Sequence, residues 1–117
     1  MIRLKVASID LDHTHPRVWE AVWRAGEIWA QHGSPDCVIT AAREQGHETN
    51  PDPTRQFHWL PDGTCQAVDI RTWSLPLSQR ALAVADLRQA LPDGFDVIYE
   101  RAGEPGEHCH LEWDDRK

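Results

Sequence analysis

The feature that most constrains the fold is a predicted β-hairpin near the end of the sequence. Residues 95–100 and 108–113 have the composition of strands, and the stretch between them is rich in Gly and Pro. Side chains two apart on a strand point to the same face, so His108 and His110 should lie side by side, with Cys109 facing away. Two imidazoles on one face, with carboxylates close by in the sequence, favour a metal site.

Apolar periodicity elsewhere predicts a small α+β domain in which two main helices pack against an antiparallel sheet. Strands are expected at residues 2–9, 37–42 and 66–73, and amphipathic helices at 18–31 and 77–91. We expect the tryptophans of the first helix to pack in the core, at positions 19, 23 and 29. The predicted buried face of the second helix contains Leu77, Ala81, Leu82, Ala85 and Leu87.

The first helix carries start and stop signals. Asp12 or Thr14 can cap it, Pro16 suits its first turn, and Gly33 ends it. The histidines at 13 and 15 form another pair two residues apart, a pattern that opens many metal-dependent hydrolases built on large barrels. Such barrels need about 200 residues or more, so this pair is interpreted as part of the helix cap.

Length and composition restrict the class of protein. The 117 residues, 40% of them apolar, suffice for one domain with a single core, taken as 1–117. A formal net charge of −7 argues against a nucleic-acid-binding surface, which needs clustered Lys and Arg. No apolar run approaches the roughly 18 residues of a membrane span, and the charged start is no secretory signal, so synthesis in the cytoplasm is expected. Three cysteines without paired spacing fit reduced thiols.

An aspartate upstream extends the predicted metal chemistry. Asp69 lies between apolar residues of the strand at 66–73, where a carboxylate is costly unless it has a partner. A catalytic zinc takes three protein ligands and keeps one position open for water. We expect Asp69 and His110, each on a strand, to be two of these ligands, and His58, in the preceding loop, to be the third.

The remaining catalytic roles have their own candidates. Zinc lowers the pKa of its water toward about 7, and a carboxylate within reach of that water would act as general base. Glu107 and Glu100 are the two alternatives: strand alternation points Glu107 away from His110 unless it belongs to the turn, whereas Glu100 approaches from the partner strand. His108 is a candidate for stabilising the oxyanion, and Arg43 for holding a carboxylate or polarising a carbonyl.

The ordered set of motifs resembles the zinc D-Ala-D-Ala carboxypeptidases and L-alanyl-D-glutamate endopeptidases, including short phage-encoded members. This group shares a superfamily with lysostaphin-type peptidases and the hedgehog domain. Residues 38–44 resemble the family strand that ends in an arginine assisting the transition state, 67–71 its zinc–aspartate strand, and 95–100 with 108–112 its closing hairpin. The resemblance implies a hedgehog-like fold, with zinc on His110, an upstream glutamate as base, and peptidoglycan stem peptides containing D-amino acids as substrate.

One spacing departs from the family pattern. The family places its first histidine seven residues before the aspartate, where this chain has Asp62. His58 lies eleven residues before Asp69, as though residues 61–64 were a turn inserted after the ligand, and Asp62 is the alternative ligand. The departure motivates a second hypothesis, a non-catalytic, virion-associated phage module of the same fold in which zinc is structural or absent.

Overall fold

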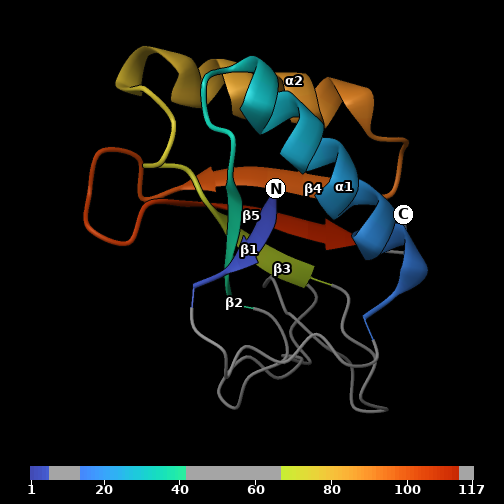
Figure 1. Cartoon of the computed structure of the whole chain (residues 1–117). Coiled ribbons are helices and arrows are strands. Elements are labelled where there is room, and N and C mark those ends of the chain that lie inside the picture. The colour runs from blue at the N-terminus through green and yellow to red at the C-terminus, as the bar shows by residue number, and fades with distance from the viewer. Residues whose placement is uncertain (6–13, 42–66, 114–117) are drawn as a thin grey trace.

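Two main helices and five strands make up the part of the chain that the computed structural model describes, residues 1–5, 14–41 and 67–113. In chain order the elements are β1 (Ile2–Leu4), α1 (Pro16–Gln31), β2 (Cys37–Ala41), β3 (Ala67–Arg71), the short 3₁₀ helix η1 (Leu77–Gln79), α2 (Arg80–Ala90), β4 (Phe95–Glu100) and β5 (His108–Trp113). Both helices lie on the same face of the sheet (Figure 1). The predicted α+β class is confirmed.

The sheet is mixed rather than antiparallel. Its strand order is β1-β2-β3-β5-β4, and β1 runs parallel to β2 while the other neighbours are antiparallel. The prediction of an antiparallel sheet is therefore wrong at one edge. The reason is the connection: α1 lies between β1 and β2 in the sequence, and a helical crossover returns the chain in its original direction.

Helix α1 is capped by His15 rather than by Thr14. The Nδ1 atom of His15 accepts a hydrogen bond of 3.1 Å from the backbone N–H of Arg17. The interpretation of His15 as part of the cap is thus confirmed, the choice of Thr14 is wrong, and Asp12 lies outside the described residues. At the other end, Gly33 has a φ of +100°, a left-handed conformation that glycine adopts without steric cost.

A single hydrophobic core lies between the helices and the sheet. Its helical members are Val18, Ala21, Val22, Ala25, Ile28 and Trp29 from α1, with Ala83, Val84 and Leu87 from α2. Of the three tryptophans expected in the core, only Trp29 is fully buried, whereas Trp19 is half-buried and Trp23 is 63% exposed. The buried stripe of α1 passes through Val18, Val22 and Trp29, which leaves position 23 on the outer side.

The predicted buried face of the second helix is confirmed at Leu87 and wrong at the other positions. Leu77 and Leu82 are exposed, and the buried positions of α2 are Ala83, Val84 and Leu87. Residues 77–79 wind as the 3₁₀ helix η1, with about 3.0 residues per turn instead of 3.6. Periodicity counted from Leu77 is therefore out of phase with the α-helix that follows.

Strand β5 has one apolar face and one polar face. Cys109 and Leu111 belong to the core under the helices, whereas His108, His110 and Glu112 alternate with them and lie on the other face. Cys109 is a free thiol whose pKa is raised by burial, as expected for a side chain that faces away from the histidines. Neither α1 nor α2 is long and apolar enough to cross a membrane.

Candidate functional site

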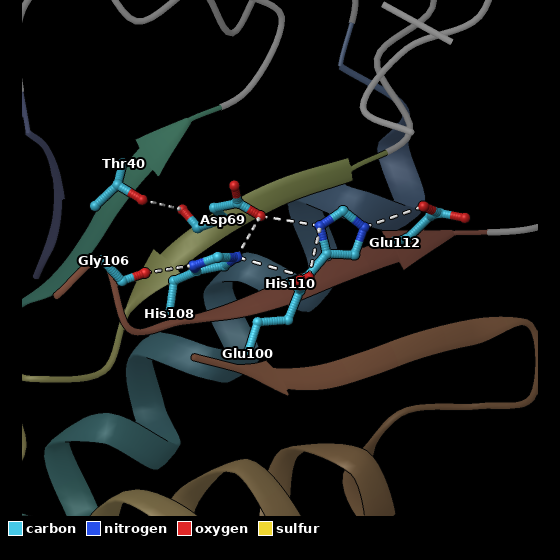
Figure 2. A network of polar contacts seen from close by, with 7 residues as sticks. All are labelled: Thr40, Asp69, Glu100, Gly106, His108, His110 and Glu112. Atoms are coloured by element: carbon cyan, nitrogen blue, oxygen red, sulfur yellow. Dashed lines mark hydrogen bonds and ion pairs between the residues drawn. The ribbon is translucent and has the colours of Figure 1, made fainter. Parts of the chain in front are cut away.

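Strand register brings four of the predicted site residues together on the face of the sheet that is turned away from the helices. The Cα atom of Asp69 in β3 pairs with that of His110 in β5, and Glu100 in β4 pairs with His108. Residues directly opposite each other on antiparallel strands point to the same face. Asp69, Glu100, His108 and His110 consequently form one group, called here the polar cluster (Figure 2).

His110 is held between two carboxylates. Its Nδ1 lies 2.9 Å from Oδ1 of Asp69 and its Nε2 lies 3.1 Å from Oε1 of Glu112. All three side chains are buried, His110 to 2% exposure. Burial by itself lowers the pKa of His110, but the hydrogen bonds to Asp69 and Glu112 and their charges outweigh it and raise that pKa to about 9. The ring is thus fixed in orientation by a carboxylate at each nitrogen.

The ring of His108 is oriented by a backbone carbonyl of the hairpin turn. Its Nδ1 lies 2.8 Å from the backbone oxygen of Gly106, and because a carbonyl can only accept, Nδ1 carries the hydrogen. Its Nε2 lies 3.7 Å from Oδ1 of Asp69 and 3.6 Å from Oε1 of Glu100, beyond normal hydrogen-bonding distance. His108 therefore presents Nε2 toward the space between the two carboxylates.

Glu100 is the most exposed member of the polar cluster. Its side chain is 34% exposed, against 3% for His110, and Oε1 lies 4.0 Å from Nδ1 of His110. The residue ends β4, where its carboxylate borders both the histidines and solvent. Its carboxylate is therefore in contact with the cluster on one side and with water on the other.

Glu107, the other candidate base, lies on the helix-facing side, as strand alternation predicts. Its Oε1 accepts a 2.5 Å hydrogen bond from Thr72, and Oε2 accepts one of 3.0 Å from the backbone of Gly103 and forms a 3.3 Å ion pair with Arg80. Burial tends to raise the pKa of Glu107, but hydrogen bonds from Thr72, Gly103 and Tyr99, together with Arg80, lower it below its usual value. These contacts tie the hairpin turn to the core.

Two predicted site residues are not placed. Arg43 and His58, together with the alternative ligand Asp62, lie outside the described residues. Within residues 1–5, 14–41 and 67–113, no group of three or more His, Cys, Asp or Glu is arranged to hold a metal ion. Of the predicted zinc ligands, the structure brings Asp69 and His110 into contact.

Glu112 is the site residue that sequence reasoning missed. It is two residues after His110, so strand alternation alone places it on the same face, and this signal was sufficient to find it. The backbone oxygen of Gly106, by contrast, has no sequence signal beyond its position in a Gly- and Pro-rich turn. Thr40 is a smaller addition, with its hydroxyl 3.4 Å from the backbone oxygen of Asp69.

Comparison with known proteins adds no relative. No family model, no curated protein and no solved structure matches the chain. The fold is that of a small α+β domain with a five-stranded mixed sheet and two main helices in its described part. The chemistry of the polar cluster and the order of the motifs are therefore the grounds on which a function can be argued.

Proposed function

We propose that the protein is a zinc-dependent peptidase acting on peptides that contain D-amino acids, such as peptidoglycan stem peptides, on a hedgehog-like fold. The observation that carries the proposal is the setting of His110, whose Nε2 contacts buried Glu112 while Nδ1 faces Asp69. A histidine that binds a metal commonly donates its other ring N–H to a carboxylate or carbonyl. The order of the motifs along the chain supports the same class of enzyme.

The side chains present fit zinc. Imidazole nitrogen and carboxylate oxygen are usual zinc donors, and Asp69 and His110 would hold the ion, with His58 as third ligand and Asp62 as its alternative. To act as a ligand, Nδ1 of His110 must carry no proton, and the contact of Nε2 with Glu112 keeps the ring in place. A bound zinc ion supplies Lewis acidity, which lowers the pKa of water and polarises a carbonyl.

We assign the general base to Glu100. Its carboxylate borders both histidines and is partly exposed, so it can accept a proton at the site and release it to solvent. Glu107 is already engaged by Thr72, Gly103 and Arg80 on the other face of the sheet. Using Glu107 as the base would require breaking these contacts.

His108 and Arg43 complete the proposed machinery. His108 is held through Nδ1 by Gly106, so its Nε2 is directed at the site and, when protonated, can donate to an oxyanion. Arg43 follows the end of β2 by two residues in the sequence. We assign it to polarising the carbonyl that is attacked, as the resemblance implies.

The test compares four variants for zinc content and peptide cleavage. Elemental mass spectrometry should find about one zinc per chain in the wild-type protein, and His110→Ala should lose both zinc and cleavage of cell-wall fragments. Glu100→Gln should keep zinc and lose about 10²- to 10⁴-fold in kcat. His32→Ala, a histidine at the end of α1, serves as the control that keeps both. Glu107→Gln should keep cleavage at temperatures where it stays folded. Cleavage by His110→Ala at the wild-type rate would refute the proposal.

A non-catalytic module of the same fold is the second candidate, in which zinc is structural or absent. The observation that favours it is that both ring nitrogens of His110 already have carboxylate partners, so this buried histidine is satisfied by the protein itself. In that case Asp69→Asn should lower the stability of a protein that does not cleave peptides, whether or not it holds zinc. Zinc retention with turnover in the wild-type protein would exclude it.

A further inference from the structure

Strand β3 carries a cationic side chain that the proposed chemistry does not use. Arg71 is two residues after Asp69, on the same face of the strand, and its Cα atom pairs with that of His108. It is the one Arg or Lys within β3, β4 and β5. A permanent positive charge therefore lies next to the polar cluster, which contains two carboxylates.

The guanidinium of Arg71 is stacked but not hydrogen-bonded. Its central carbon lies 4.1 Å from the centroid of the Trp73 ring, and Trp73 is 55% exposed. Its Nε atom is buried without a hydrogen-bond partner, the one such side-chain atom in the described part of the chain. Buried donors are nearly always satisfied, so an unsatisfied one calls for a functional explanation.

Two other arginines, Arg80 and Arg88, have guanidinium groups that are hydrogen-bonded within the protein. Arg80 donates to the backbone oxygens of Leu75 and Trp73 and pairs with Glu107. Arg88 donates through two nitrogens to the backbone oxygen of Val97. Both are committed to the protein, whereas the guanidinium of Arg71 is held, among the described residues, by its stacking on Trp73 alone.

The backbone that carries Arg71 and Trp73 is fixed on both sides. The carbonyl oxygen of Arg71 accepts a 3.0 Å hydrogen bond from Nε1 of buried Trp29, and that of Trp73 accepts one of 3.2 Å from Arg80. Between them, the hydroxyl of Thr72 donates to Glu107. A side chain on such a rigid support is pre-organised for binding.

We propose that Arg71, stacked on Trp73, binds a carboxylate of the peptide substrate. The inference rests on the proposed function and deepens it. A guanidinium donates two parallel hydrogen bonds to a carboxylate, while the indole holds the fork in position and offers apolar surface to the neighbouring residue of the peptide. Because Arg71 lies beside His108, the bound carboxylate is close to the cleaved bond, so the substrate class is peptides with a free carboxylate there.

The experiment uses one peptide in two forms, L-Lys-D-Ala-D-Ala with a free C-terminal carboxylate and the same peptide amidated. The wild-type protein should prefer the acid by about tenfold or more in kcat/KM. Arg71→Gln should abolish the preference, mainly by raising KM for the acid. Arg71→Lys should keep part of the preference for the acid, because lysine keeps the positive charge but lacks the two parallel N–H donors of the guanidinium. Arg24→Gln on α1, whose arginine pairs with Glu27 at the surface, is the matched control and should leave the preference intact.

A second readout separates failure of this inference from failure of the proposed function. Calorimetric titration of the acid and the amide into wild-type protein and Arg71→Gln measures binding without turnover. Tighter binding of the acid that disappears in Arg71→Gln supports the carboxylate site even if neither peptide is cleaved. Equal binding of the two forms, no binding of either, or an acid preference that persists in a folded Arg71→Gln would overturn the inference. Cleavage of both forms in that last case would leave the peptidase proposal standing.

Discussion

The Nε2 atom of His110 lies 3.1 Å from Oε1 of Glu112, and both side chains are buried on the same face of β5. The proposal that His110 binds zinc makes Glu112 the residue that orients it. Glu112→Gln should therefore weaken zinc binding by about 10- to 100-fold, which competition with a chromogenic chelator measures. Glu20→Gln, at an exposed position of α1, is the control. An unchanged zinc affinity in folded Glu112→Gln would remove that role.

Glu107 should make the protein sensitive to acid. Its pKa is lower in the folded chain than the ordinary value of 4.5, so its stabilising contribution is complete above pH 4.5 and is lost as pH falls through the folded value. Urea unfolding followed by tryptophan fluorescence should show the free energy of unfolding falling below about pH 4.5. Glu107→Gln should be less stable at neutral pH and show a weaker dependence on pH. A dependence that is identical in both proteins would contradict the assignment.

The contact between the two helices should respond to pH in the opposite sense. His32, after the end of α1, lies 2.8 Å from Gln79 and 2.6 Å from Asp86, and these two hydrogen bonds raise its pKa above 6.5. The stabilisation is complete below pH 6.5 and is lost as pH rises through the folded value. An NMR titration of the His32 ring should give the raised pKa, and Asp86→Asn should lower it. Lack of a change in that variant would argue against the contact.

Trp29 and Trp23 provide a matched pair for the core. Trp29→Phe removes the indole N–H that donates to the backbone oxygen of Arg71, leaving a part-buried acceptor without that partner. The expected loss is about 1–3 kcal/mol in the free energy of unfolding. Trp23→Phe, at a largely exposed position of the same helix, should change it by less than about 0.5 kcal/mol. Equal effects of the two substitutions on urea unfolding would contradict the arrangement of α1.

Local pattern predicted the hairpin well, because alternation, a Gly- and Pro-rich turn and adjacency in sequence all act within twenty residues. Both of its strands, Phe95–Glu100 and His108–Trp113, have the predicted bounds. The contact between Asp69 and His110 is of another kind, since β3 and β5 are separated by a helix and a strand and their register depends on tertiary packing. The parallel pairing of β1 with β2 likewise depends on where α1 packs, and local periodicity in the sequence does not reveal that position.

The polar cluster shows the same division. Strand alternation was enough to place His108 and His110 together and Glu107 on the other face. It was not enough to choose Glu100 as the carboxylate beside them, because that choice depends on the pairing of β4 with β5. The buried contact of Glu107 with Arg80 joins the hairpin turn to the second helix and had no signal in the sequence spacing.

The turn between β4 and β5 connects the two faces of the sheet through its backbone. On the helix side, the carboxylate of Glu107 accepts a hydrogen bond from the backbone N–H of Gly103. On the opposite side, the backbone carbonyl of Gly106 accepts one from the ring Nδ1 of His108. The tautomer of that histidine is therefore dictated by a carbonyl whose position depends on an anchor across the sheet. Breaking the contact between Glu107 and Gly103 would free the Gly106 carbonyl to move, and the imidazole of His108 could then exchange its donor and acceptor nitrogens. The position of the proton on His108 is therefore coupled to the packing on the opposite face of the sheet.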